Sequence, residues 1–268
     1  MARSTIHAWV RAPTADLERC ELGYVVREPI DIGRALEQHA RFVEALRAAG
    51  AKVHLLPPLP GNPHACFVAD CAVNLRFANR SIVVGARSPV AGREVEVSSV
   101  LDALPSSLEL ERLPSESDRL ECSDVLQVGD LVLLGWSSRS SFESQTKMRA
   151  SCAGRRQPNA IVMVRRILHL RSAAADLGER TVLLSPRHAF GPRMDELEQV
   201  FVDPAEPDAA SVLRIGEVLI GEQAYPATRA LLEARGHPYV ALDLSEFRKA
   251  EGGPARLAFL WSDAEAES

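Results

Sequence analysis

The twelve residues Leu242-Asp-Leu-Ser-Glu-Phe-Arg-Lys-Ala-Glu-Gly-Gly253 are the most distinctive stretch of this chain. They lead from a predicted strand at Tyr239–Leu242 to two adjacent glycines, and a further strand is predicted at Leu257–Trp261. Arg256 lies between the glycines and that last strand. What this stretch implies depends on the order of strands and helices in the rest of the chain.

Several segments have the spacing or the end signals of a helix. In Asp31–Gly50 the apolar side chains recur on one face, and Gly50 suits the C-terminal end. Tyr225–Arg235 has Pro226 near its first turn and Gly236 after its last residue, which is the usual placement of both residue types. Further helices are predicted over 93–104 and 141–153.

Short apolar runs bounded by turn residues predict the strands. Gly129-Asp130 between two such runs is a hairpin signal, and Gly216 suits a second hairpin within Val212–Ile220. The remaining strands are predicted over 6–10, 52–56, 66–75, 81–84, 108–113, 124–128, 131–134, 160–164, 181–184 and 197–202. Strands and hairpins therefore alternate with helices about five times, which favours a repeated ββα-type unit over a doubly wound sheet.

The composition argues against several classes of protein. Among 268 residues the net charge is −5, and no basic stripe suggests nucleic-acid binding. No window approaches the roughly 18 apolar residues of a membrane span, and residues 1–10 lack the apolar core of a signal peptide. The phosphate-binding patterns GxGxxG and GxxxxGK[ST] are absent. We therefore expect a cytoplasmic protein with a single domain over 1–261 and a polar tail over 262–268.

Five cysteines occur without a pairing pattern, at positions 20, 66, 71, 122 and 152. An odd number in a cytoplasmic chain indicates reduced thiols. Cys66, Cys71 and His64 lie close together in sequence, but no second pair of ligands has zinc spacing. We therefore expect no metal and no organic cofactor.

Several short segments, in nearly matching order and spacing, resemble the dimethylarginine dimethylaminohydrolases. They are Arg34-Ala-Leu-Glu-Gln-His-Ala, Leu55-Leu-Pro-Pro58, Cys66-Phe-Val-Ala-Asp70 (FVED in the family), Glu121-Cys-Ser-Asp-Val125 with Val128-Gly-Asp130 (EAGD and VGD), Ser137-Ser-Arg139, Ile167-Leu-His169-Leu, Tyr225-Pro226 with Thr228-Arg229, and the stretch 242–253. The resemblance implies an α/β fold, the pentein or five-bladed α/β propeller, with ββαβ-type units around a pseudo-fivefold axis and a central channel.

In that family a cysteine attacks the guanidinium carbon, carboxylates hold the cation, and a histidine oriented by an acidic residue transfers protons. Carried over by position, His169 matches the catalytic histidine and Glu121 its carboxylate partner. Asp70 matches a guanidinium-binding aspartate, and Arg139 matches an arginine that contacts the substrate carboxylate. Where the family has the catalytic cysteine, three residues after the second glycine, this chain has Arg256.

Other positions also depart from the family pattern. Ala69 replaces a glutamate that binds the guanidinium, His64 stands in place of a substrate-binding aspartate, and Ser123 replaces a glycine. Arginine stays protonated near neutral pH and cannot act as the nucleophile. We expect Arg256 to hold an anionic group or to pair with Asp70 or Glu121, and His64 to line the pocket.

Two kinds of catalysis could replace the attack by the family's cysteine. His169 with Glu121 retains what general acid–base catalysis requires, so proton transfer, elimination, cyclisation or water-driven hydrolysis stays open. On a regular strand Cys66 would share the face of Asp70 and is the candidate for a substitute nucleophile, although core packing is the more common role of such a residue.

These residues leave three functions open. The first is a divergent enzyme acting on a small amino-acid-like substrate through His169 and Glu121, with Asp70, Arg139, Arg256 and His64 binding the substrate. The second is an inactive pentein that binds a metabolite or a protein partner. The third is ordinary hydrolysis of dimethylarginine. The sequence leaves the oligomeric state open, with a homodimer as one expectation.

Overall fold

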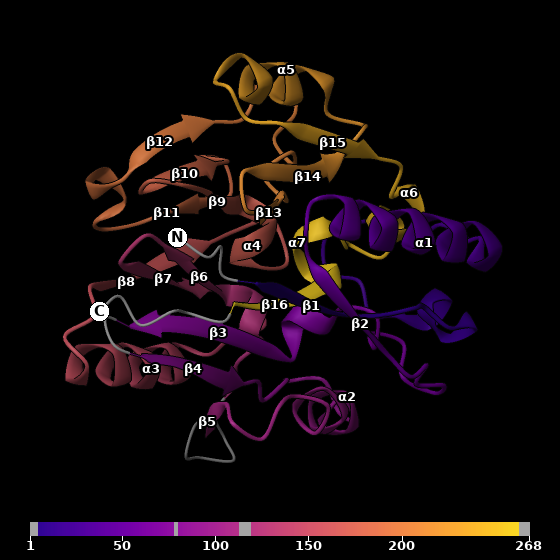
Figure 1. Ribbon diagram of the computed structural model, residues 1–268, viewed down its shortest axis with the longest axis horizontal. Coiled ribbons are helices and arrows are strands. Elements are labelled where there is room, and N and C mark those ends of the chain that lie inside the picture. Colours follow the sequence, from indigo (N-terminus) through magenta and orange to yellow (C-terminus); the bar gives the residue numbers. More distant parts are fainter. Residues whose placement is uncertain (1–4, 78–79, 113–118, 263–268) are drawn as a thin grey trace.

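The computed structural model describes residues 5–77, 80–112 and 119–262, which form five small sheets around a central axis (Figure 1). The strands are β1 (Ile6–Arg11), β2 (Lys52–Leu56), β3 (Ala72–Phe77), β4 (Arg80–Gly85), β5 (Glu109–Arg112), β6 (Val125–Val128), β7 (Leu131–Trp136), β8 (Asn159–Val164), β9 (Ala174–Gly178), β10 (Thr181–Leu184), β11 (Ala189–Phe190), β12 (Glu198–Phe201), β13 (Leu213–Ile215), β14 (Val218–Glu222), β15 (Tyr239–Leu242) and β16 (Ala258–Ser262). The helices are α1 (Ile32–Ala48), α2 (Glu94–Leu101), α3 (Phe142–Gly154), α4 (Leu170–Ala173), α5 (Pro226–Ala234), α6 (Ser245–Lys249) and α7 (Pro254–Leu257), with short 3-10 turns η1 (Ala15–Arg19), η2 (Val68–Asp70), η3 (Cys122–Asp124) and η4 (Met194–Glu196).

Each sheet repeats the same connection. Two antiparallel strands come first, a helical segment follows on the outside, and a third strand then pairs parallel with the second, as in β3–β4, α2 and β5. The other sheets are β6–β7–β8 with β11 at its edge, β9–β10–β12, β13–β14–β15 and β16–β1–β2. The last sheet joins both ends of the chain, because β16 is antiparallel to β1. The predicted five-bladed pentein propeller is confirmed.

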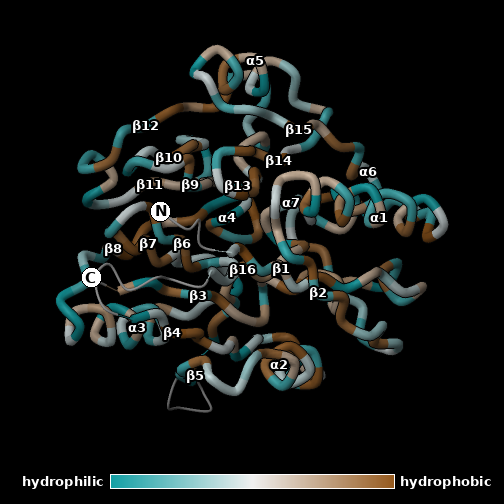
Figure 2. Tube along the Cα trace, in the orientation of Figure 1, coloured by the Kyte–Doolittle hydropathy of each residue, from teal (hydrophilic) through white to brown (hydrophobic). Residues whose placement is uncertain are grey.

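The outer helices α1, α2, α3 and α5 lie at the periphery of the ring (Figure 1). Helix α1 begins at the predicted place, where the Asp31 carboxylate accepts a hydrogen bond from the Arg34 backbone N–H at 3.0 Å. Phe42 and Leu46 bury its apolar face against the closing sheet. Figure 2 shows hydrophilic and hydrophobic residues interspersed along α1, as expected for a helix with one buried face. No helix in the described ranges is long and apolar enough to cross a membrane.

The prediction of a strand over 66–75 is wrong in its first half. Residues 64–70 form consecutive turns, in which the Phe67 N–H donates to the His64 carbonyl at 2.9 Å and the Asp70 N–H donates to the Phe67 carbonyl at 3.0 Å. Strand β3 starts only at Ala72. The run is apolar because these turns are buried in the core, so the argument that Cys66 shares a strand face with Asp70 does not apply.

Some elements were not predicted. Strand β9 is rich in alanine, which has weak strand propensity, and α4, α6 and α7 are too short for a helical period to show. Ser262, predicted to begin the tail, is the last residue of β16 and pairs with Ile6. The rest of the predicted tail, 263–268, and Leu113 of the predicted strand 108–113 lie outside the described residues.

Short helical turns lead into four of the five blades and position the candidate site. The turns η2, η3, α4 and α7 directly precede the inner strands β3, β6, β9 and β16. They carry Asp70, Glu121, His169 and Arg256 respectively, with Glu121 and His169 at the residue before the turn. The turns contact one another near the axis, so residues far apart in sequence meet there.

Candidate active site

The guanidinium of Arg256 occupies a binding site built by the chain itself. Its Nε donates to Asp70 Oδ1 at 3.1 Å and its Nη2 donates to Asp70 Oδ2 at 2.6 Å. Its Nη1 donates to the Glu251 carbonyl at 2.8 Å, and its Cζ lies 4.2 Å from the centroid of the Phe67 ring. Both charged side chains are almost fully buried. A paired carboxylate and an aromatic face are what a protein uses to bind a guanidinium cation.

A second buried arginine, Arg93, joins three carboxylates. Its Nη1 donates to Glu121 Oε1 and its Nε donates to Glu96 Oε2, each at 2.6 Å. A longer contact of 3.4 Å reaches Asp70 Oδ2. Sequence patterns place Arg93 only at the start of a helix, since nothing local shows that Asp70 and Glu121 meet it from two other turns.

His169 and Glu121 form the predicted pair. His169 Nε2 lies 2.5 Å from Glu121 Oε2, and Ser88 Oγ donates to the other carboxylate oxygen at 2.6 Å. His169 is fully buried, and its Nδ1 has no hydrogen-bond partner among the described residues. When the neutral ring donates from Nε2 to Glu121, Nδ1 carries the lone pair that can accept a proton.

The turn that carries His169 is held in place by a hydrogen bond to Asp124. The Leu170 N–H donates to Asp124 Oδ1 at 2.9 Å, while Ser137 and Ser140 donate to Asp124 Oδ2 at 2.6 and 2.7 Å. Ser123, the residue in place of the family glycine, donates to Asp70 Oδ1 at 2.6 Å. Nothing in the local sequence indicates this contact, because Ser123 and Asp70 are 53 residues apart.

The carboxylates at the centre are ionised. Burial alone would raise the pKa of Asp70, but the charges of Arg256, His169 and Arg93 hold it well below the usual range. Burial opposes ionisation of Glu121 as well, and Arg93 together with the hydrogen bond from His169 lowers its pKa. The same carboxylates raise the pKa of Arg93 and of Arg256 against the effect of burial.

His64 and Arg139 lie at the side of this centre. His64 is buried, its Nε2 accepts a hydrogen bond from the Glu21 N–H at 3.2 Å, and burial with the nearby Arg93 and Arg256 charges lowers its pKa to about 3. Arg139 reaches the Glu21 carboxylate at 3.5 Å and makes no contact with Asp70 or Glu121 in the described residues. Of the six predicted site residues, Arg256 contacts Asp70 and His169 contacts Glu121, and ligand atoms of Asp70, Glu121 and His169 lie within 4.8 Å of one another.

None of the five cysteines has the surroundings of a nucleophile. All five are buried, and burial raises the pKa of each thiol, for example to about 12 for Cys71 and to about 11 for Cys152. Cys66, the candidate substitute, packs in the apolar cluster that contains Phe67 and Phe247. The thiols therefore stay protonated at neutral pH.

Three groups of the centre have the donor types of a metal site. Ligand atoms of Asp70, Glu121 and His169 all lie within 4.8 Å of one another. However, the two carboxylates already accept hydrogen bonds from Arg256 and Arg93. A divalent cation would have to enter beside two guanidinium charges, so the arrangement favours internal ion pairs over a metal.

A cavity of about 360 Å³ lies beside the centre. Its walls include residues 252–254 of the double-glycine turn, Leu168 next to His169, and residues 24–26. Glu251 ties these walls together, because its carboxylate accepts hydrogen bonds from the Gly23 N–H at 2.7 Å and the Val25 N–H at 3.1 Å. The charged lining residues are of both signs: Glu28, Asp208, Glu222, Glu251, Arg166, Arg248 and Lys249.

Comparison with known proteins identifies the family. A scan against models of protein families finds no match. The dimethylarginine dimethylaminohydrolase of Streptomyces coelicolor is 30% identical over 249 residues, covering 91% of this chain and 93% of the relative. The enzyme of the same name from Pseudomonas aeruginosa is 27% identical over 226 residues, or 83% of this chain and 87% of the relative. The chain belongs to the dimethylarginine dimethylaminohydrolase family.

Solved structures agree on the fold of the family. A cysteine-to-serine variant of the Pseudomonas aeruginosa dimethylarginine dimethylaminohydrolase, complexed with citrulline, superposes with a TM-score of 0.84 over 95% of this chain and 98% of that one, at 24% identity. The N-terminal domain of ArgZ, covalently bound to a reaction intermediate, gives a TM-score of 0.81 over 97% and 98%, at 19% identity.

Proposed function

We propose that this chain is a family member that does not hydrolyse guanidines and uses His169 as a general acid–base on a small amino-acid-derived substrate. The observation that carries the proposal is the position of the Arg256 guanidinium, which fills the cation site formed by Asp70 and Phe67. A relative is known in complex with citrulline. Here a guanidinium substrate would have to displace Arg256 and would meet its positive charge.

The loss of guanidine hydrolysis also has a chemical basis. The resemblance of the double-glycine stretch puts Arg256 at the position of the family's nucleophilic cysteine. An arginine cannot attack carbon near neutral pH, and burial keeps the five thiols of the chain protonated. A covalent intermediate on sulfur therefore has no candidate residue.

The pair of His169 and Glu121 supports general acid–base catalysis, which needs no cysteine. Glu121 orients the imidazole, and Nδ1 is the atom that would exchange a proton with the substrate. The adjoining cavity has acidic and basic walls, which suits a zwitterionic amino acid. Reactions that fit are proton abstraction, elimination, cyclisation, and hydrolysis by a water molecule that His169 activates.

The first test is turnover by the purified chain with and without His169. We expect no citrulline from arginine or methylarginines, and product formation from a different amino-acid derivative that His169→Ala abolishes. His237→Ala serves as the matched control, because His237 lies after α5 and outside the site. Citrulline release from a methylarginine by the unmodified chain would refute the proposal, and so would unchanged turnover in His169→Ala.

A second candidate is binding without turnover. It is favoured by the complete burial of His169 and by the fact that neither of the two cavities described here is lined by His169, Glu121 or Asp70. A thermal-shift screen with arginine, methylarginines, citrulline, agmatine and ornithine separates the two candidates. Stabilisation by a compound that is not converted supports the binding function.

A further inference from the structure

A second cavity, of about 340 Å³, lies at the other end of the central channel. Each inner strand runs away from the centre described above, since Asp70 precedes β3, Glu121 precedes β6, and Arg256 precedes β16. The lining residues Arg76, Gln127, Asp176 and Ser262 come six or seven positions after Asp70, Glu121, His169 and Arg256 respectively, at about 3.3 Å per residue of strand. All five inner strands contribute, with Asn74 and Arg76 from β3, Gln127 from β6, Asp176 from β9, Arg214 from β13, and Leu260, Trp261 and Ser262 from β16.

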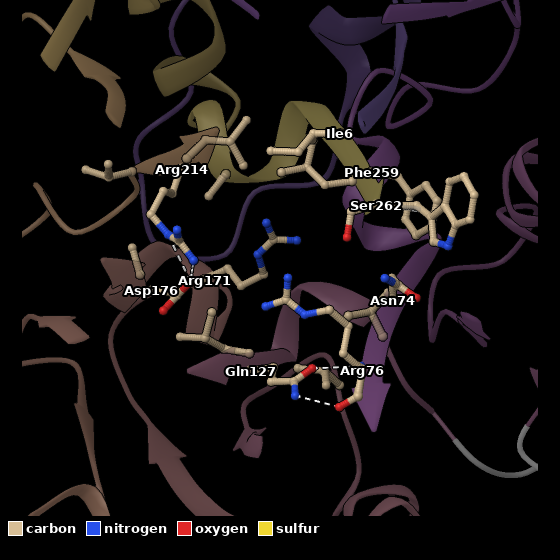
Figure 3. Close-up of a pocket in the computed structure, with 18 of the residues that line it drawn as sticks. Ile6, Asn74, Arg76, Gln127, Arg171, Asp176, Arg214, Phe259 and Ser262 are labelled. Atoms are coloured by element: carbon tan, nitrogen blue, oxygen red, sulfur yellow. Dashed lines mark hydrogen bonds and ion pairs between the residues drawn. The ribbon is translucent and has the colours of Figure 1, made fainter. Parts of the chain in front are cut away.

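Three arginines point into this cavity (Figure 3). Arg76 and Arg214 come from inner strands, and Arg171 comes from α4, two residues after His169. Arg214 is paired with Asp176, to which its Nη2 donates at 2.5 Å. In Figure 3 no dashed line reaches the guanidinium group of Arg76 or Arg171, and neither group has an ion-pair partner among the described residues.

The cavity therefore holds an excess of positive charge. Its charged lining residues are three arginines and one aspartate. Asp70, whose charge acts on Arg171 from outside the cavity lining, is already engaged by Arg256 and Arg93. Burial lowers the pKa of Arg171 to about 10 against the opposing effect of the Asp70 charge.

We propose that this end of the channel binds a small organic dianion, a phosphate monoester or a dicarboxylate, on Arg76, Arg171 and Arg214. Guanidinium groups match the oxygens of phosphate and carboxylate groups through paired hydrogen bonds. The side chains of Asn74, Gln127 and Ser262 add polar groups, and the remaining lining contains apolar side chains that suit the carbon skeleton of such a ligand. This site is separate from the cavity lined by Leu168 and residues 252–254, so the proposal stands without the proposed function.

The test measures anion binding to the full chain at constant ionic strength. Calorimetry and thermal shift are carried out with inorganic phosphate and with succinate, and sodium chloride controls for general salt effects. We expect at least one of the two dianions to bind and to raise the melting temperature, and the tighter of the two shows which kind of group the site prefers. No binding of either dianion beyond the effect of chloride overturns the proposal.

Variants then locate the binding. Arg76→Gln changes an exposed side chain and should leave folding intact, while Arg171→Gln removes the partly buried cation. We expect each to weaken binding at least tenfold. The matched control is Arg41→Gln, which removes an exposed arginine of α1 outside the cavity and should leave the affinity unchanged. Wild-type affinity in Arg76→Gln, or equal weakening in Arg41→Gln, would show that the anion binds elsewhere.

Discussion

The pair of Arg256 and Asp70 makes the stability of the protein depend on its site. Both groups are almost fully buried and hydrogen-bonded to each other through two contacts. Removing one member of such a pair leaves a buried charge without its partner, which commonly costs about 3–5 kcal/mol. Arg93 remains near Asp70, but its shorter hydrogen bonds go to Glu96 and Glu121.

We therefore predict that Arg256→Ala lowers the melting temperature by about 10 °C, the shift that a loss of this size gives in a chain of this length. Millimolar guanidinium should restore part of the loss by occupying the vacated place between Asp70 and Phe67. The double variant Arg256→Ala/Asp70→Asn should not respond, and Arg235→Ala, which breaks an exposed ion pair with Glu198, should change stability little. Equal responses of the single and double variants would contradict the assignment of this cation site.

Ionisation of Glu222 makes the stability of the folded protein depend on pH in the direction opposite to that of Asp70. Burial raises its pKa to about 7 although Arg248 is in contact with it. Because the folded state holds the proton more tightly than the unfolded state, Glu222 contributes stability that is complete below about pH 4.5 and is lost as the pH rises through about 7.

The predicted effect of Glu222 is on the order of 3 kcal/mol across that window. Thermal melts between pH 5 and pH 8 should show the melting temperature of the unmodified chain falling with pH more steeply than that of Glu222→Gln. Parallel profiles for the two proteins would mean that Glu222 is ionised throughout. Asp70 contributes in the reverse direction and below this window, since its lowered pKa affects stability only as the pH falls below about 4.

At the level of residues, the sequence was informative where the family resemblance supplied a position. Ligand atoms of Asp70, Glu121 and His169 lie within 4.8 Å of one another, and the roles assigned to them stay predictions. Arg93 could not be recognised, because its role arises only when η2, η3 and the start of α2 come together in space. The sequence left three possible partners for Arg256: an anionic ligand, Asp70, or Glu121. Only the folded geometry shows that the partner is Asp70.

The elements that decide the site are the short turns at the inner ends of the blades. Hairpins such as β6–β7 and β13–β14 were predictable, because Gly129 and Gly216 adopt the positive φ angles that such turns need. The turns η2 and α7 were not, since three or four residues show no helical period. The double-glycine turn is constrained by packing: a Cβ on Gly252 would lie 2.3 Å from Phe67 Cε1, so only glycine fits beneath the ring that Arg256 stacks on.

Glu251 connects that turn to the loop at residues 23–25 through its carboxylate. We predict that Glu251→Gln speeds amide hydrogen exchange at Gly23 and Val25, because an amide keeps only one acceptor oxygen in place of two. Glu44→Gln, on the exposed face of α1, provides the control. Unchanged exchange at both amides would show that other contacts hold the loop.

In the whole molecule, the ring is closed by strands from its two ends. Trp9 of β1 pairs with Phe259 of β16, and both side chains are buried in the same cluster as Val68. The inner strands of neighbouring blades contact one another around the axis. This arrangement agrees with the expectation of a single domain over residues 1–261, which stays a prediction.

That prediction is tested by unfolding. We expect one cooperative transition, with the same midpoint by far-ultraviolet circular dichroism and by tryptophan fluorescence. Phe259→Ala, which deletes a fully buried ring, should lower the free energy of unfolding by about 3–5 kcal/mol and keep the transition single. Two separated transitions in either protein would indicate that the blades form more than one cooperative unit.

The closing sheet has a consequence for how the chain matures during its synthesis. Strand β1 is synthesised before the other strands of the fold, while Arg256 and β16 follow the strands of the other four blades. Until they emerge, β1 has no antiparallel neighbour, and Asp70 lacks the cation that neutralises it in the finished fold. A nascent chain stalled before residue 254 should therefore stay sensitive to protease with four blades already translated, and emergence of residues 254–262 should complete the ring and the site in one step.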